Sequence, residues 1–537
     1  MSMHTSPPPT PQLEQSAGDA AGARMPDGGT SRDDAPLPGK LADKRLAWSL
    51  ALLATVGYGL LAAWWTPRGP MSAFEGLSAM GLALLAGCAA GFLLRTRWAM
   101  LAAPLTFAIA FELARFETTG PTVDGIHLTS TYGVMAFVVG RGVHALLALL
   151  PMALGAALGA ALSRRRLSTS RHGRVLLSGV ALWLRRGVAV ATGLVLVAMA
   201  AFIARPATTD PIVDADRQTV VGSVAELTRV EIGGRDLALM IRGRSTQNPV
   251  LLFLAGGPGG SELGAMRRHS QALEDDFVVA TFDQRGTGKS YDQLDPASTM
   301  TLEGAVNDAV AVTNYLRDRF DEEKVYLVGQ SWGTTLGVLA VQQHPELYRA
   351  YVGVGQMVSQ AATDKIIYQD TLAWAREEGN TDLVSTLEAN GPPPYTDVLH
   401  YEAALSHLME VHPYDHSPNS EGSGEMSENL LVEEYTLLEQ VHILGATLDV
   451  FAALYPQLQD IDFRTQATRL EVPVYLAQGR HEAPGRQVLA QEWFKQLRAP
   501  SKDLTYFDTS GHRPLWQQPT EFRNLMTDVL ADTAPNR

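Results

Sequence analysis

A serine flanked by glycines has the residue types and spacing of an activated nucleophile. The segment Gly329–Gly333 reads Gly-Gln-Ser-Trp-Gly, with the apolar run Val325–Val328 before it and the helical stretch Thr334–Gln343 after it. This strand–turn–helix context is that of a nucleophile elbow, in which small residues permit the sharp turn that exposes the hydroxyl. The structural alternative is a glycine-rich turn whose serine caps the next helix. The context favours Ser331 as a catalytic nucleophile.

A serine hydroxyl needs a base, and the base needs an acid that orients it. His512 follows the apolar run Leu504–Phe507 and precedes the last helical stretch, so we predict that it is the base. Glu482 follows the apolar run Val472–Ala477, and we predict that it is the acid. The competing acids are nearby loop carboxylates, namely Asp460, Asp462 and Asp508.

Acyl transfer also needs backbone donors for the oxyanion. The glycine-rich segment Ala255–Gly260 follows the apolar run Val250–Leu254, and we predict that the backbone N–H groups of Gly257 and Trp332 are these donors. A phosphate-binding loop is the competing interpretation, but no Lys-Ser/Thr pair follows these glycines. The segment Gly286–Ser290 lacks the first glycine that such a loop requires.

Apolar runs alternate with helical stretches through the second half of the chain. The runs Leu227–Ile232 and Leu237–Ile241 flank a glycine pair and predict a hairpin. The alternation that follows predicts a parallel sheet covered by helices on both faces. A mostly helical stretch, 356–462, interrupts it. We therefore expect an α/β core formed by 226–355 and 463–537, with 356–462 as a helical cap.

The first half of the chain is dominated by long apolar runs. A membrane-spanning helix needs roughly 20 apolar residues, with about 17 as the lower limit. Four of the runs reach that limit, and Trp98–Leu113 is slightly short. A buried helix of a large soluble core is the alternative for any single run, but a series of them predicts a membrane domain over 46–205. The runs are Leu46–Trp65, Leu77–Leu94, Trp98–Leu113, Val143–Leu162 and Gly187–Ala204.

Basic residues concentrate in alternate connections between these runs, before the first, between the second and third, and between the fourth and fifth. By the positive-inside rule, this pattern places residues 1–45, a Pro- and Gly-rich tail, in the cytoplasm. Five crossings then place the linker 206–225 and everything after it on the outer face. The start of the chain has no apolar core with a cleavage site, so no signal peptide is expected.

The balance of charged residues also changes near residue 205. Residues 1–205 carry 18 Lys and Arg against 10 Asp and Glu, whereas the remainder carries 25 against 47, and the whole chain has a formal net charge of −14. The acidic half argues against a nucleic-acid partner, which requires basic surface. The single cysteine, Cys88, excludes a disulfide framework and a cysteine zinc site. We expect a lipid bilayer and a small substrate as partners, and no cofactor or metal.

Several of these motifs together resemble the proline iminopeptidase (prolyl aminopeptidase) family of α/β-hydrolases. The resemblance rests on Ala255–Gly260, Asp283–Ser290 (Asp-Gln-Arg-Gly-Thr-Gly-Lys-Ser) and Gly329–Leu336, and continues at Gly479–Glu482 and Gly511-His512. It implies an α/β-hydrolase fold with a helical cap and removal of N-terminal residues from short peptides. It also implies the same nucleophile, acid, base and oxyanion donors.

The chain departs from the family pattern at three places. Ala255 stands where the family usually has His, and Glu482 stands where its acid is usually Asp. The cap has no clear copy of the Trp-x-x-Trp-Glu-like stretch whose acidic groups bind the substrate amine. Trp374, Glu433 and Glu434 could serve that role, although solvated helix faces are the alternative.

The leading hypothesis is a membrane-anchored hydrolase that removes N-terminal residues from short peptides outside the cytoplasm. An esterase or lipase-like hydrolase of small or membrane-derived esters is the alternative among enzymes, and an apolar acyl pocket would favour it. A catalytically inactive ligand-binding membrane protein is the alternative from another class. The presence of all three predicted catalytic residues argues against it.

Overall fold

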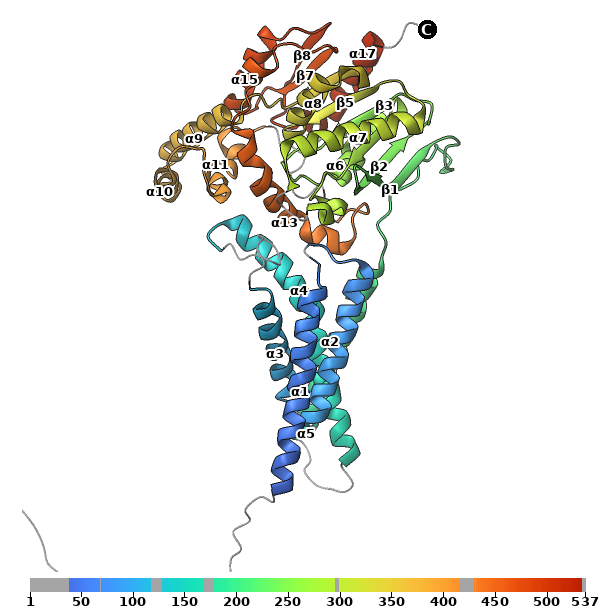
Figure 1. Cartoon of the computed structure of the whole chain (residues 1–537), viewed down its shortest axis with the longest axis vertical. Helices are drawn as coiled ribbons and strands as arrows, with labels where there is room; N and C mark the ends of the chain where they lie inside the picture. Colours follow the sequence, from blue (N-terminus) through green and yellow to red (C-terminus); the bar gives the residue numbers. More distant parts are fainter. Residues whose placement is uncertain are drawn as a thin grey trace, which may run out of the picture. The chain divides into compact units, whose positions relative to one another are not determined.

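The structure is a computed structural model that describes residues 38–67, 69–116, 128–167, 177–294, 299–414, 429 and 431–533. Figure 1 shows long helices formed by the first part of the chain and a sheet flanked by helices formed by the second. The predicted tail lies outside the described residues up to residue 37, and so do Arg68, Arg171 and Arg174 of the basic connections. Helix α1 (Pro38–Trp65) already begins within the predicted tail.

The second part of the chain is built on an eight-stranded mixed sheet in the order β1-β2-β4-β3-β5-β6-β7-β8. Strand β2 pairs antiparallel with β1 and with β4, and all other neighbours are parallel. The predicted α/β-hydrolase fold is confirmed. The strands are β1 (Val224–Ile232), β2 (Arg235–Gly243), β3 (Val250–Leu254), β4 (Val278–Phe282), β5 (Val325–Gln330), β6 (Tyr348–Val354), β7 (Val474–Gly479) and β8 (Lys502–Phe507).

Each face of this sheet carries its own apolar cluster. Every residue of β3 is buried, and alternate residues enter opposite clusters: Val250, Leu252 and Leu254 one, Leu251 and Phe253 the other. Because a strand alternates its side chains, a sheet covered on both faces requires this continuous apolar run. One cluster includes α7 (Leu302–Phe320), α8 (Trp332–Gln343) and α15 (Pro484–Gln496); the other includes α6 (Leu263–His269), α16 (Pro514–Gln517) and α17 (Pro519–Thr533).

A group of helices is inserted between β6 and β7. The helices are α9 (Gln360–Glu377), α10 (Thr381–Asn390), α11 (Glu402–Leu405), α12 (Leu408–Val411), α13 (Leu437–Leu454) and α14 (Phe463–Gln466). The hydroxyl of Thr436 accepts from the backbone N–H of Glu439, whose side chain accepts in return from the Thr436 N–H, so α13 begins with a capping box. This insertion occupies the position that the sequence predicts for a cap.

Five helices in the described part of the chain are long and apolar enough to cross a membrane, judged by length and composition. They are Asp43–Trp65, Ala73–Leu94, Thr131–Arg164, Trp183–Ala204 and Leu437–Leu458. The last contains α13, whose residues Ala446, Val450 and Leu454 belong to the core of the hydrolase fold. The candidate spans are therefore α1, α2 (Ala73–Leu94), α4 (Thr131–Leu167) and α5 (Leu177–Ala204), together with the shorter α3 (Ala99–Ala114).

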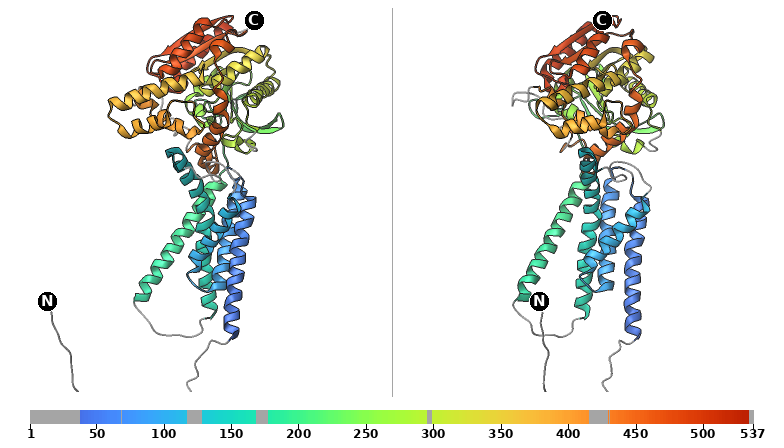
Figure 2. Two further views of the ribbon diagram at one scale, coloured as in Figure 1. Left: turned by 60° about the vertical axis from the view of Figure 1, so that its left-hand side comes forward. Right: turned by 90° about the vertical axis from the view of Figure 1, so that its left-hand side faces the viewer.

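Helices α2 and α4 approach each other through glycines. Gly87 and Gly91 lie one turn apart on α2, and Gly155 and Gly159 have the same spacing on α4. A Cβ on Gly87 would lie 2.0 Å from a backbone carbonyl oxygen of α4, and one on Gly155 would lie 2.1 Å from a carbonyl oxygen of α2. Such small-xxx-small pairs let helix backbones pack closely in a bilayer. Figure 2 shows these helices, in blue and teal, running alongside one another.

The predicted linker is held against the sheet. The guanidinium Nη1 of Arg242, a buried residue of β2, donates to Thr209 Oγ1 and to the carbonyl oxygen of Asp210, both at 2.6 Å. The same guanidinium pairs with buried Glu274, with 2.7 Å between Nε and Oε1. A charge-assisted contact to two successive linker residues fixes the path of the chain as it enters the hydrolase fold.

Candidate active site

Ser331 lies at the turn between β5 and α8, with φ 52° and ψ −119°. A positive φ is strained for any residue with a side chain, so neighbouring contacts must hold this turn. A Cβ on Gly333 would lie 2.1 Å from the carbonyl oxygen of Leu254, and one on Gly329 would lie 2.4 Å from the carbonyl oxygen of Gly333. The Gly-x-Ser-x-Gly spacing is therefore a requirement of close backbone packing at this turn.

His512 comes from the loop after β8 and reaches Ser331. Its Nε2 atom is 2.8 Å from Ser331 Oγ, which is hydrogen-bond distance. The backbone N–H of Gly511 donates to Gln517 Oε1 at 2.9 Å and anchors the loop beside the ring. Gly355, with φ 56° at the end of β6, leaves room for the ring, since a Cβ there would lie 2.8 Å from His512 Nδ1. The structure thus brings Ser331 and His512 together.

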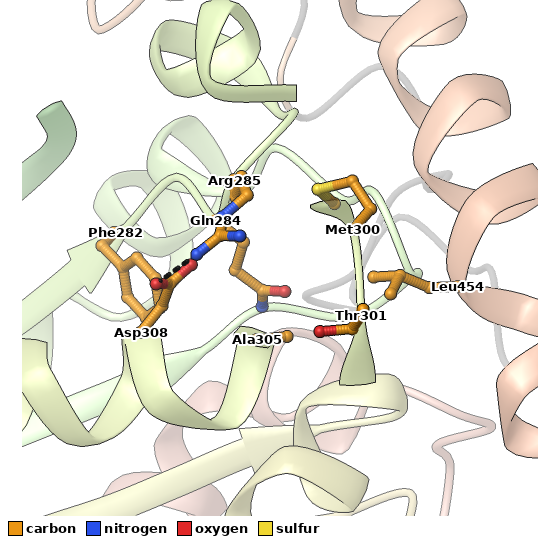
Figure 3. Close-up of a pocket in the computed structure, with 8 residues that line it drawn as sticks. All are labelled: Phe282, Gln284, Arg285, Met300, Thr301, Ala305, Asp308 and Leu454. Carbon is orange, nitrogen blue, oxygen red and sulfur yellow. Dashed lines mark hydrogen bonds and ion pairs between the residues drawn. The ribbon is translucent and has the colours of Figure 1, made fainter. Parts of the chain in front are cut away.

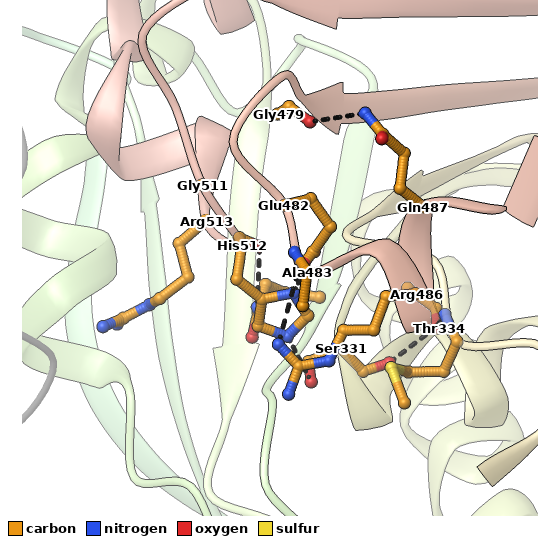
Figure 4. A network of polar contacts seen from close by, with 12 residues as sticks. Ser331, Thr334, Gly479, Glu482, Ala483, Arg486, Gln487, Gly511, His512 and Arg513 are labelled. Atoms are coloured by element: carbon orange, nitrogen blue, oxygen red, sulfur yellow. Dashed lines mark hydrogen bonds and ion pairs between the residues drawn. The ribbon is translucent and has the colours of Figure 1, made fainter. Parts of the chain in front are cut away.

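Glu482 completes a chain of polar contacts through His512, as Figure 4 shows. Its Oε2 atom accepts from His512 Nδ1, and its Oε1 atom accepts from the Ala483 N–H at 2.9 Å and lies 3.3 Å from Arg486 Nη1. The residue is only 4% exposed. Burial alone would raise the pKa of this carboxyl, but the charges of His512 and Arg486 and the hydrogen bonds outweigh it and lower the pKa to about 2.

Two of the three competing acids have other partners. Asp508 pairs with Arg480, with 2.5 Å between the carboxylate and Nε, and both side chains are more than half exposed. Asp462 caps α14 and pairs with Arg464 at 2.7 Å. Among the predicted acids, Glu482 is the one that contacts His512. The catalytic role of the three side chains remains a prediction.

The predicted oxyanion loop, Ala255–Gly260, connects β3 to α6 beside the turn that carries Ser331. A Cβ on Gly256 would lie 2.2 Å from Gln330 Oε1, so the loop and the turn are in direct contact. Gly257 has φ 124°, a conformation that glycine adopts without strain. The segment with Gly257 thus lies against the segment with Ser331 and Trp332, and the two donor roles stay a prediction.

Comparison with known families identifies the fold. The family described as the alpha/beta hydrolase fold matches residues 249–519, about half of the chain. The chain belongs to the α/β-hydrolase family. This α/β-hydrolase has long apolar helices before its hydrolase fold, and they lie outside the matched residues.

The α/β-hydrolase is similar to several peptidases. A probable aminopeptidase of Bacillus subtilis, YbaC, is 28% identical over 306 residues, which cover 57% of this chain and 96% of the relative. The proline iminopeptidase of Lactobacillus delbrueckii subsp. bulgaricus is 23% identical, over 54% of this chain and 92% of the relative. Among solved structures, the proline iminopeptidase of Mycobacterium smegmatis matches with 17% identity and a TM-score of 0.41, over 57% of this chain and 98% of that chain. The sequence similarity to the two curated relatives shows that the hydrolase is distantly related to proline iminopeptidases.

The three cap residues predicted to bind the substrate lie in contacts of their own. Glu434 is fully buried and its carboxylate lies 2.7 Å from Arg267 Nε. Glu433 is partly exposed and pairs with Arg205 at 2.6 Å. Trp374 contacts the ring of His407, with 5.8 Å between the ring centroids. The contacts described for these residues do not connect them to the Ser331–His512–Glu482 chain.

Sequence reasoning missed two neighbours of the candidate catalytic chain. Arg486 lies four residues after Glu482, a spacing that could have indicated an ion pair where a helix begins. Gln284 belongs to the Asp-Gln-Arg-Gly stretch that carries the family resemblance, and its side chain contacts Trp332. No local spacing indicates that contact, because the two residues are 48 positions apart.

One pocket of the α/β-hydrolase is lined in part by Gln284, whose side chain contacts Trp332 (Figure 3). An ion pair of 2.6 Å between Arg285 and Asp308 forms part of its wall. The lining residues are Phe282, Gln284, Arg285, Met300, Thr301, Ala305, Asp308 and Leu454. Within the described residues, no group of three or more His, Cys, Asp or Glu side chains could hold a metal ion.

Proposed function

We propose that this chain is a membrane-anchored serine hydrolase in which Ser331 is the nucleophile, His512 the base and Glu482 the acid. The observation that carries the proposal is the continuous polar chain from the buried Glu482 carboxylate through the His512 ring to the Ser331 hydroxyl. The low pKa of Glu482, about 2, keeps this carboxylate charged over the whole working range of pH.

In the proposed reaction, His512 Nε2 accepts the proton of Ser331 Oγ as that oxygen attacks the substrate carbonyl carbon. The carbonyl oxygen becomes an oxyanion and accepts from the N–H groups of Gly257 and Trp332. The imidazolium, stabilised by Glu482, gives its proton to the leaving amine or alcohol as the acyl-enzyme forms. Water then attacks the acyl carbon while His512 accepts a proton from it. His512 passes this proton to Ser331 Oγ, so the acid is released and Ser331 is restored.

We propose an aminopeptidase of the proline iminopeptidase type, acting on the N-terminal residue of short peptides. The support is the similarity to relatives described as a probable aminopeptidase and as proline iminopeptidases. One observation favours the second candidate, an esterase. Glu433 and Glu434, which could bind a substrate amine, are paired with arginines, and an ester substrate needs no amine-binding carboxylate.

The deciding experiment is an activity profile of the purified full-length chain in lipid nanodiscs. Prolyl, alanyl and leucyl p-nitroanilides would be compared with p-nitrophenyl acetate and butyrate. Cleavage of an anilide with a free amino group at least tenfold faster than cleavage of its N-acetylated form supports the aminopeptidase. Turnover of the esters alone supports the esterase. Ser331→Ala should lose about 10⁴–10⁶ in rate and resist labelling by a fluorophosphonate. Ser245→Ala, in the half-buried turn between β2 and β3, should behave as the wild type.

We also propose the orientation that the basic connections indicate, with the N-terminal tail in the cytoplasm and the hydrolase fold on the outer face. A protease added to cells stripped of any outer envelope should then cut the region after Arg205 and spare a tag placed at Met1. Protection of the hydrolase fold in intact cells, with cleavage after lysis, would place it in the cytoplasm and leave the catalytic proposal standing.

A further inference from the structure

The side-chain amide of Gln284 joins the two segments that carry the predicted oxyanion donors. Its Nε2 atom donates to the carbonyl oxygen of Ala255 at 3.0 Å, and its Oε1 atom accepts from Trp332 Nε1 at 2.8 Å. Ala255 begins the glycine loop that contains Gly257, and Trp332 directly follows Ser331. One planar group therefore spans from one wall of the predicted oxyanion hole to the other.

Burial makes the loss of either hydrogen bond of this bridge unfavourable. Gln284 is 7% exposed, Trp332 2% and Ala255 1%. A buried polar group without a partner is destabilised by the loss of its hydration, so each end of the amide is held to its partner. The bridge needs a donor at one end and an acceptor at the other, which an amide supplies and a carboxylate does not.

The bridge also holds a loop whose first side chain is apolar. The loop begins with Ala255, whose methyl group can make no hydrogen bond, so the loop depends on its backbone groups for polar support. The Ala255 carbonyl is held by Gln284, and the next N–H, that of Gly256, donates to Glu262 Oε2 at 2.9 Å. The peptide group that joins Ala255 to Gly256 is thus held at both its carbonyl and its N–H, immediately before Gly257.

We propose that Gln284 is a positioning residue that sets the separation between the N–H groups of Gly257 and Trp332. The inference rests on the proposed function, because the separation matters only if these groups bind an oxyanion. Oxyanion donors must lie about 2.7–3.1 Å from the oxygen of the tetrahedral intermediate, and small displacements weaken them. Loss of the bridge therefore acts on the transition state, which lowers kcat and leaves KM nearly unchanged.

The test uses Gln284→Glu, which removes the donor to Ala255, and Trp332→Phe, which removes the indole donor and keeps the backbone N–H. Each variant, and the double variant, is measured in the full-length chain with p-nitrophenyl acetate, and fluorophosphonate labelling counts the reactive sites. Gln342→Glu, at an exposed amide near the far end of α8, is the matched control for the new charge.

We expect each single variant to lose about tenfold to a hundredfold in kcat with KM within threefold and a full count of reactive sites. The kcat of the double variant should be no lower than that of the more impaired single variant, because both changes break the same bridge. The inhibition constant of phenylboronic acid, which forms a tetrahedral adduct with the serine, should rise with the loss in kcat.

The inference is overturned if Trp332→Phe keeps kcat within threefold, or if the losses multiply in the double variant. Should Gln284→Glu fail to fold, Trp332→Phe alone decides by the same criteria. A wild type that turns over the ester, with an inactive Ser331→Ala and unaffected bridge variants, rejects the bridge and keeps the proposed function. A wild type without turnover or labelling rejects both.

Discussion

In the hydrolase region the largest side chains are innermost, whereas in the N-terminal helices many large apolar side chains are exposed and glycines lie at the contact between α2 and α4. Trp332, Trp493 and Phe253 are almost fully buried around the sheet. Leu53 of α1 is 69% exposed and Leu85 of α2 is 66% exposed. The two regions of one chain thus differ in how many of their large apolar side chains are exposed.

The difference follows from the solvent that each region is built for. In water, burial of large apolar side chains is the main favourable term in folding. Lipid tails are as apolar as leucine, so no such force brings helices together in a bilayer, and close contact of small residues takes its place. Outward leucines and inward glycines are what a lipid environment favours, and this supports the proposed membrane domain.

The largest expected effect belongs to the polar chain in the hydrolase region. Glu482→Gln keeps the size of the side chain but removes the charge that stabilises the His512 imidazolium, so kcat should fall by up to about 10⁴ with little change in KM. Asp508→Asn and Asp462→Asn make the same change at carboxylates with other partners and should keep kcat. An unaffected Glu482→Gln beside a collapsed aspartate variant would mean that the acid is misassigned.

One leucine truncation in each region tests the contrast in packing. Leu252 of β3 is fully buried, so Leu252→Ala should reduce the free energy of unfolding by about 2–5 kcal/mol. Leu53→Ala on the outward face of α1 should change it by less than about 0.5 kcal/mol. Thermal and denaturant unfolding of the full chain in nanodiscs would measure both. Equal losses would show that the outward face of α1 is packed against protein.

The third prediction concerns how the stability of the protein depends on pH through the buried carboxyl group of Asp283. Burial raises the pKa of Asp283 to about 7, although hydrogen bonds from the Lys289 N–H and the Tyr435 hydroxyl partly oppose it. A raised pKa favours the neutral carboxyl, so its contribution to stability is full below about pH 4 and is lost as the pH rises through about 7. The stability of the wild type relative to Asp283→Asn should therefore fall by roughly 2–4 kcal/mol between pH 4 and 8.

A matched change, Asp382→Asn at an exposed carboxylate of α10, is the control for the Asp283 experiment. Its stability difference from the wild type should stay nearly flat over the same pH interval. The same flat difference for Asp283→Asn would mean that the Asp283 carboxyl is hydrated or already charged at pH 4.

The smallest expected effect is on the glycine contact between α2 and α4. Gly155→Leu places a side chain against backbone that cannot move aside, so we expect a destabilisation of about 1–3 kcal/mol, seen as a lower thermal midpoint in detergent. Gly142→Leu is the matched control on the same helix, because a Cβ on Gly142 meets no atom within 4 Å. A midpoint unchanged in both variants would remove the contact as a source of stability.

Much of the fold could be predicted because it depends on local signals. The predicted apolar runs before the site residues agree to within a few residues with β3, β5, β7 and β8. The helical cap was predicted only as a block. Within it, the segment that contains α13 is long and apolar enough to cross a membrane, judged by length and composition. Residues Ala446, Val450 and Leu454 of α13 pack in the core of the hydrolase fold. These contacts are not local, so the sequence pattern does not indicate them.

The candidate site divides in the same way. Ser331, His512 and Glu482 could be named because each follows a recognisable strand at the same edge of the sheet. The partners of Glu434 and Gln284 could not, because Arg267 and Trp332 are far away in sequence and no spacing rule links them. The predicted amine-binding role for Glu434 lacked this information, since a carboxylate buried against an arginine looks in sequence like any other acid.

The insertion of the cap between β6 and β7 has a consequence for the order in which the protein is made. Ser331 and His512 are 181 residues apart, and the whole cap lies between them. A ribosome adding 5–20 residues per second needs roughly 10–40 s to travel that distance. During this time the proposed nucleophile is present without its proposed base. In the proposed mechanism, a nascent chain therefore carries an unactivated serine until the loop after β8, which holds His512, has been made.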